Sequence, residues 1–172
     1  IPLLTLSASF DKLKDLETVW SCVNDLLIFE AIPEEMLMGV VTLALQMAHN
    51  KEQDPHLRHV PLEALVPALS FFDFDLVSQI LSLSLDITAC IIEQDGVLCE
   101  DSLSEFDVAT QSFDHSIMYP LIRNQIQQAF SSGSCSHQIV GLLLFALLLN
   151  SYSDLIYNDM EEVLAFLHQA IQ

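Results

Sequence analysis

Apolar residues recur at spacings of three and four along most of the chain, which is the pattern of helices that bury one face. The clearest stretch is residues 60–92, where two such stripes are separated by a short acidic turn containing Asp73 and Asp75. Pro61 can open the first helix, because the first turn of a helix does not need its N–H, and either aspartate can cap the second. A hairpin this apolar has to pack against neighbours, so the pattern predicts stacked helical hairpins.

The same pattern predicts a hairpin on each side of this one and a last helix. The predicted helices span residues 9–27, which Ser9 caps, 33–50, 113–130 and 136–149, followed by a final helix that Asp154 caps and that reaches residue 171. The apolar run at 139–149 should make its helix the most buried element. Pro67 and Pro120 each fall inside a predicted helix and should interrupt it, the first near residues 63–66.

Residues 81–88 also permit a second interpretation, because they alternate apolar and polar positions as a half-buried strand would. The helical stripe through this stretch extends further than the alternation does. No neighbouring segment offers a matching strand. We therefore expect a helix here.

Residues 94–112 break the helical pattern with carboxylates, a turn at Asp95-Gly96 and scattered single apolar residues. We expect an inserted acidic loop, with at most a short helical turn near Glu105. The second helices of the three hairpins begin near Pro33, Asp75 and Ser136, at intervals of 42 and 61 residues, and removing the 19 inserted residues makes the two intervals equal. Helical repeats of the HEAT and armadillo type have periods of roughly 40–47 residues.

Val66-Pro67-Ala68-Leu69, Phe71-Phe72, the acidic turn, Val77 and residues 80–88 together resemble one armadillo or HEAT-type repeat. The resemblance implies an all-α fold of stacked antiparallel hairpins, an α-solenoid fragment of about seven helices, and a role in protein binding. The glycine that often separates armadillo helices is missing. Asp86 stands where that family has its peptide-binding asparagine, so no specific ligand contact is carried over.

Charge narrows the class of partner. The chain has 24 acidic and 5 basic residues, a formal charge of −19, which repels nucleic acid phosphates and anionic lipid surfaces. No lysine or arginine lies between His59 and Tyr119 or after Arg123. We expect no direct nucleic acid or membrane contact and a protein partner with a basic or amphipathic segment. The alternative is that the acidity only keeps a leucine-rich chain soluble.

The predicted contact residues are the acids and phenylalanines expected at exposed turns and in the acidic loop. They are Asp73, Phe74, Asp75, Asp86, Glu105, Phe106 and Asp107. Phe74 and Phe106 are expected where turns reach solvent, so they are the candidates for an apolar contact. Ser102 and Ser104 each have a carboxylate three residues downstream, a context that acidophilic kinases accept for phosphorylation.

The sequence shows no reaction chemistry. It lacks a Gly-x-Ser-x-Gly elbow, a phosphate-binding glycine loop, a dinucleotide fingerprint and a His-Glu-x-x-His motif. An EF-hand around Gly96 would put Ile91 and Ser102 at the two most demanding ligand positions. His56 and His59, near Glu52 and Asp54, are interpreted as solvated loop histidines. We expect no enzyme activity, no metal and no cofactor.

Length and cysteine usage predict the domain organisation and the cellular compartment. The 172 residues suit a single helical-repeat domain, and a chain that begins with Ile1 suggests a piece of a longer one. Four irregularly spaced cysteines indicate buried free thiols in a reducing compartment, hence the cytoplasm or nucleus. The predicted function is a non-catalytic interaction scaffold in a larger complex. The alternatives are a compact Bcl-2-like bundle around residues 139–149 with a groove for an amphipathic helix, and a metal-dependent enzyme using His56 and His59.

Overall fold

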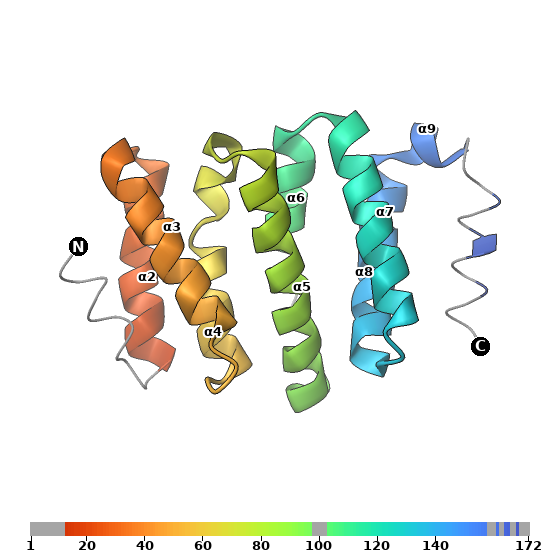
Figure 1. The fold of residues 1–172 in the computed structure, drawn as a ribbon, viewed down its shortest axis with the longest axis horizontal. Coiled ribbons are helices and arrows are strands. Elements are labelled where there is room, and N and C mark those ends of the chain that lie inside the picture. The colour runs from red at the N-terminus through yellow and green to blue at the C-terminus, as the bar shows by residue number, and fades with distance from the viewer. Residues whose placement is uncertain (1–12, 98–102, 158–160, 162–163, 166–167, 169–172) are drawn as a thin grey trace.

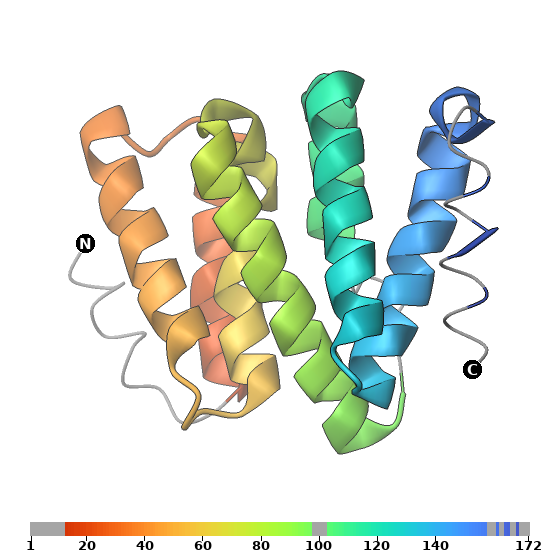
Figure 2. The same cartoon turned by 45° about the vertical axis from the view of Figure 1, so that its right-hand side comes forward.

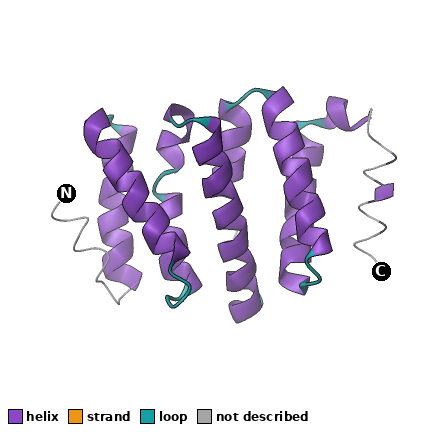
Figure 3. Ribbon diagram, in the orientation of Figure 1, coloured by secondary structure: helices purple, strands orange, loops and turns teal. Residues whose placement is uncertain are grey.

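The computed structural model describes residues 13–97 and 103–157 and, near the end of the chain, residues 161, 164, 165 and 168. These residues are helical apart from short connections, and none of them forms a strand (Figure 3). The elements are α2 (Leu13–Ile28), α3 (Glu34–His49), α4 (Pro55–Glu63), the 3-10 helix η1 (Val66–Phe71), α5 (Phe74–Asp95), α6 (Ser104–Ser112), α7 (His115–Ser131), α8 (Cys135–Ser151) and α9 (Ser153–Ile156). The all-α prediction is confirmed, including a helix over residues 81–88.

The helices stand side by side in two layers (Figure 1). In that view α3, α5 and α7 form the nearer layer, and α2, α4 with η1, α6 and α8 form the farther one. Figure 2, turned by 45°, shows the same division. Successive helices run in opposite directions (Figure 1). α4 packs against both α3 and α5, whereas α2 packs against α4 and η1.

The expected acidic loop at 94–112 is wrong for most of its length. Its first two residues end α5, and Ser104–Ser112 forms α6, which packs against η1 in the farther layer. Phe106 and Ala109 have no exposed surface, so apolar burial holds this short helix in place. Because α6 takes a place of its own, α7 lies in the layer of α3 and α5, and residues 94–112 cannot be subtracted as a loop outside the stack.

Aspartates cap three of the helices, α4, α5 and α7. Asp54 accepts a hydrogen bond from the His56 backbone N–H at 2.9 Å, so α4 begins at Pro55 and not at Pro61. Asp73 accepts one from the Leu76 N–H at 2.8 Å, which confirms an aspartate cap at the start of α5. Each bond satisfies a backbone donor that the first helical turn leaves free.

The two helices expected to break at proline behave differently. α4 ends at Glu63, and the chain restarts at Val66 as η1 with Pro67 in its first turn, so the interruption predicted there is confirmed. α7 runs without a break through Pro120, and the interruption predicted there is wrong. Met118 and Ile122, both without exposed surface, flank Pro120 and anchor α7 on either side of it.

The most buried element is α5, and the prediction that this would be the helix at 139–149 is wrong. Ile139, Leu142 and Leu149 of α8 are 36%, 43% and 43% exposed. The inner face of α8 still packs closely on α7, since a Cβ at Gly141 would lie 3.1 Å from Ala129 Cβ. By length and composition alone α5 could cross a bilayer, and 61% of its most apolar window is buried by other helices, as in a core helix.

The structure tests the prediction of buried thiols for three of the four cysteines. Cys22, Cys90 and Cys135 are free thiols, but Cys22 and Cys135 are exposed, so the prediction of buried thiols is wrong for them. Cys99, the Ser9 cap and most of the predicted final helix lie outside the described residues.

Candidate partner-binding site

The structure separates the predicted contact residues into three places. Asp73, Phe74 and Asp75 lie at the start of α5, Asp86 lies further along the same helix, and the remaining three belong to α6. Asp73 and Asp75 are exposed. Phe74 is half-buried because its ring meets that of Phe113 edge-on, with centroids 6.2 Å apart.

Two of the three contact residues predicted on α6 are wrong as surface residues. Glu105 and Phe106 have no exposed surface, because α6 turns the face that carries them toward the stack. Asp107 is exposed, as expected. Ser104 is half-buried, with its hydroxyl 3.5 Å from Glu105 Oε2, and Ser102 lies outside the described residues.

A groove of about 540 Å³ lies between the α2–α3 turn and the η1–α5 turn. Its lining is mostly apolar and consists of Leu27, Ile32, Leu37, Met38, Ala68, Phe71, Phe72 and Leu76, with Glu30 and Asp73 as the two acids. Met38 and Phe71 are 56% and 63% exposed, although both are large apolar side chains. Of the predicted contact residues only Asp73 lines this groove.

Glu30 sits in a backbone conformation that few residues other than glycine adopt. Its φ is +51°, the only positive φ of a non-glycine residue in the part of the chain that the structure describes. The Ala31 N–H donates to the Leu26 carbonyl at 2.8 Å and the Glu30 N–H donates to the Leu27 carbonyl at 3.0 Å, a Schellman ending of α2. Backbone strain of this kind is found most often at functional sites. Glu30 is therefore a candidate functional residue of the groove.

Sequence reasoning missed Phe71 and Glu30. Phe71 and Phe72 are adjacent in the sequence, and only Phe72 turns toward the core. Apolar periodicity could have indicated that one of two neighbours points outward. It could not identify which one, because η1 is a 3-10 helix with three residues per turn.

The electrostatics of the groove favour a cation. Glu30 and Asp73 line it, Asp75 follows in the first turn of α5, and no lysine or arginine is among the lining residues. A carboxylate at the edge of an apolar surface attracts a basic side chain more strongly than one in open water, because the local dielectric constant is lower.

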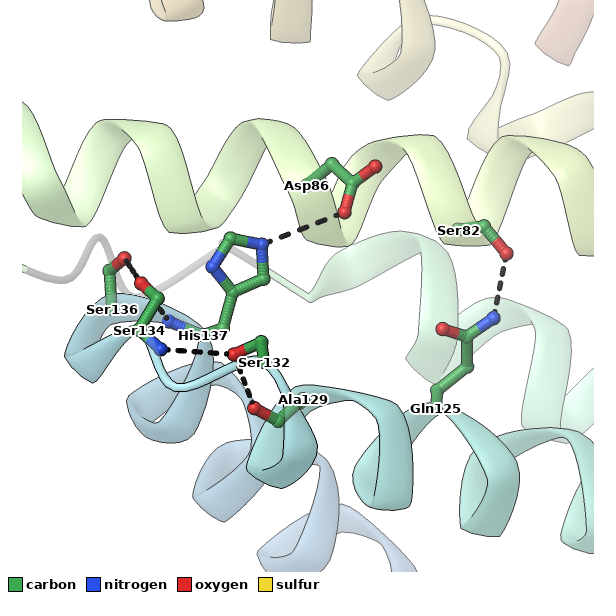
Figure 4. A network of polar contacts seen from close by, with 8 residues as sticks. All are labelled: Ser82, Asp86, Gln125, Ala129, Ser132, Ser134, Ser136 and His137. Carbon is green, nitrogen blue, oxygen red and sulfur yellow. Dashed lines mark hydrogen bonds and ion pairs between the residues drawn. The ribbon is translucent and has the colours of Figure 1, made fainter.

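Asp86 belongs to a second polar region, between α5 and the α7–α8 turn (Figure 4). Its Oδ1 lies 3.7 Å from His137 Nε2, and beside it Gln125 Nε2 donates to Ser82 Oγ at 2.7 Å. Asp86, Gln125 and His137 line a hollow of about 210 Å³. Asp86 therefore bridges two helices at a distance from the groove.

A third polar cluster joins α4, α5 and α6. His59 Nε2 lies 3.2 Å from Glu105 Oε1 and 3.5 Å from Ser84 Oγ. Burial of the ring works against its charge, but Glu105 and, less strongly, Glu63 outweigh burial, so the pKa of His59 lies above its ordinary value. The prediction of a solvated loop histidine is wrong, since the His59 side chain is 13% exposed.

The geometry of this cluster does not match a hydrolytic triad. Ser84 and Glu105 both contact the same imidazole nitrogen, whereas a triad needs the nucleophile and the acid on opposite nitrogens. Ser84 has no exposed surface. His56 contacts a different acid, since its Nε2 lies 2.7 Å from Asp95 Oδ2. Over residues 13–97 and 103–157, no three His, Cys, Asp or Glu side chains gather as a metal site would require.

No family model matches the chain, and neither the curated proteins nor the solved structures contain a match to it. The resemblance to an armadillo or HEAT-type repeat therefore stays a prediction.

Proposed function

We propose that this chain is a non-catalytic scaffold of stacked helical hairpins that binds a basic, amphipathic segment of a partner protein within a larger intracellular complex. The observation that carries the proposal is the groove between the α2–α3 and η1–α5 turns, where exposed apolar side chains adjoin two carboxylates.

The arrangement of the helices supports a hairpin stack. Helices stand in a two-layer row along the long axis of the molecule (Figure 1). α8, the apolar helix that a Bcl-2-like bundle would enclose, lies near one end of this row, with Leu142 and Leu149 exposed. A stack of this kind offers an extended surface along its row of helices for binding a partner.

The groove suits an amphipathic helix. Apolar residues on one face of such a helix fill a groove, and charged residues on its flanks meet the rim. Phe71 supplies a rigid aromatic surface and Met38 a flexible one that adapts to the shape of the partner. Glu30 and Asp73 would pair with lysine or arginine flanking the apolar stripe, and the charge of −19 would speed the encounter.

The direct test uses a synthetic amphipathic helix of about 16 residues with leucines on one face and lysines on the other. Fluorescence anisotropy should show saturable binding that weakens as salt is raised. A matched peptide with glutamates in place of the lysines should not bind. Equal binding of both peptides would contradict the acidic-rim part of the proposal.

Variants locate the site. Phe71→Ala should weaken binding about tenfold or more, because truncating a central aromatic contact costs at least about 1.4 kcal/mol. Glu30→Gln and Asp73→Asn each should weaken it roughly two- to fivefold and reduce its salt dependence, and asparagine keeps the cap of α5. The matched controls are Phe29→Ala, 79% exposed and outside the groove lining, and Asp86→Asn, in the second region. Unchanged affinity in all three groove variants would place the site elsewhere.

A further inference from the structure

Glu105 is a carboxylate with no exposed surface near the start of α6. Burying a charge is costly unless another charge compensates it. The compensating group is His59, 3.2 Å away on α4, and the Ser84 hydroxyl of α5 lies 3.5 Å from the same imidazole nitrogen. Three helices therefore meet at one buried ion pair.

Few other charges act on His59. Glu63, further along α4, is the second acid that favours the charged form of His59. Arg58, next to His59 in the sequence, turns away and donates from Nε to the Ala48 carbonyl at 2.8 Å. α5 contributes the neutral Ser84, and α2 and α3, which also pack on α4, contribute no charge that shifts the pKa of His59.

The position of α6 bears directly on the groove. α6 packs against η1, and η1 supplies Ala68 and Phe71 to the groove lining. Leu65 and Leu69, on the inner side of this segment, have no exposed surface, nor has Phe106 of α6. If α6 detached, η1 would lose part of the packing that fixes the direction of Phe71.

We infer that His59 and Glu105 form a pH-dependent latch that holds α6 against η1 and so keeps the groove in its binding shape. This inference rests on the proposed function of the groove. A protonated His59 compensates the Glu105 charge, whereas a neutral His59 leaves a buried anion without a cation, so α6 separates from η1 more often.

The direction of the pH effect follows from the raised pKa of His59. A cation stabilised by the fold contributes its full effect below the unfolded pKa of about 6.5 and loses it as the pH rises through the folded value. The latch is therefore closed in mildly acidic solution and weakens as the pH rises through the raised pKa of His59.

Hydrogen exchange of the free protein tests the latch without any partner. Amides of α6 and η1 would be followed from about pH 6 to pH 9 and corrected for intrinsic exchange. In the unmodified chain their protection should fall together, roughly tenfold for each unit by which the fold raises the pKa of His59. His59→Gln and Glu105→Gln, which retain a polar side chain but remove one charge, should show flat protection above pH 7.

His56→Gln is the matched control, because His56 also pairs with an acid, Asp95, but does so at a partly exposed site away from α6. In the His56→Gln variant, the protection of the α6 and η1 amides should fall with rising pH as in the unmodified chain. If either latch variant fails to fold, an NMR titration of the His59 ring in the unmodified chain decides instead. A ring pKa at or below 6.5, or pH-independent protection of α6, overturns the latch.

The outcomes separate the latch from the proposed function. Loss of α6 and η1 protection with rising pH, accompanied by weaker binding of the lysine peptide, supports both. Saturable binding of the lysine peptide, together with pH-independent protection of the α6 and η1 amides, overturns the latch and leaves the scaffold proposal intact. Protection that depends on pH without peptide binding at any pH supports the latch contacts and overturns both the groove function and its regulation.

Discussion

α4 with η1 and α7 face the same difficulty, a proline within an apolar helical stretch, and resolve it differently. In the first, the helix stops at Glu63 and resumes at Val66 as a 3-10 helix. In the second, the helix continues through Pro120 and packs along α8, with Gly141 allowing the close approach. A proline in the sequence therefore does not by itself determine whether a helix ends.

Neighbouring packing explains the difference. The residues after the break at Glu63 find their own burial, since Leu65 and Leu69 are fully buried and η1 packs on α2 and α6. The tighter turn of η1 leaves Phe71 exposed beside the groove. The broken segment thus contributes to the lining of the groove, whereas the continuous helix packs closely on its neighbour.

The largest expected effect tests whether α6 supports the broken segment. Phe106→Ala should lower the free energy of unfolding by about 3–5 kcal/mol, because it leaves a cavity at a fully buried position against η1. Phe71→Ala, at a residue 63% exposed, should stay within about 0.5 kcal/mol. Urea denaturation measures both, and similar losses in the two variants would contradict the packing described for η1.

The next prediction sets the two prolines against each other. Pro120→Ala should stabilise the protein by about 1–2 kcal/mol, because alanine can donate to the Ser116 carbonyl and has a higher helix propensity. Pro67→Ala should destabilise it by about 0.4–1 kcal/mol, since Pro67 stands in the first turn of η1, where no N–H is needed, and restricts the unfolded chain. Thermal unfolding of both variants gives the two signs, and equal signs would contradict the comparison.

The long helices could be predicted from the sequence, whereas the short helix α6 could not. Helices α2, α3, α5, α7 and α8 have long apolar stripes, and their positions follow from periodicity and capping, as Asp73 illustrates. α6 has only a few apolar residues among acids. Its burial depends on a contact with η1, which lies about 35 residues earlier in the chain and leaves no local signal.

The site could be predicted only in part for the same reason. Asp73 was found because a turn acid is visible in the sequence, and it lines the groove. Glu30 and Phe71 were missed, because a positive φ and the outward direction of a side chain depend on turn geometry. The pairing of His59 with Glu105 joins residues 46 positions apart, so spacing could not reveal it.

A smaller effect is expected at the turn that begins the groove. Glu30→Gly should stabilise the protein by about 0.5–1 kcal/mol, because glycine adopts a φ of +51° without strain and part of that gain is offset by the greater freedom of the unfolded chain. The same variant should weaken binding of the lysine peptide. A gain in stability with unchanged peptide affinity would show that the strain at Glu30 has no connection with binding.

The smallest effect is expected at the ion pair between Asp86 of α5 and His137 of α8, the helix on which the continuous helix α7 packs. The two groups are 3.7 Å apart and the Asp86 side chain is 71% exposed, so solvent screens their attraction. His137→Gln and Asp86→Asn should each change the free energy of unfolding by less than about 0.5 kcal/mol in urea denaturation. A larger loss would mean that this pair fastens α8 to α5 as firmly as burial does elsewhere. A small one would mean that Asp86→Asn leaves the fold intact, as a control for the peptide-binding measurements has to do.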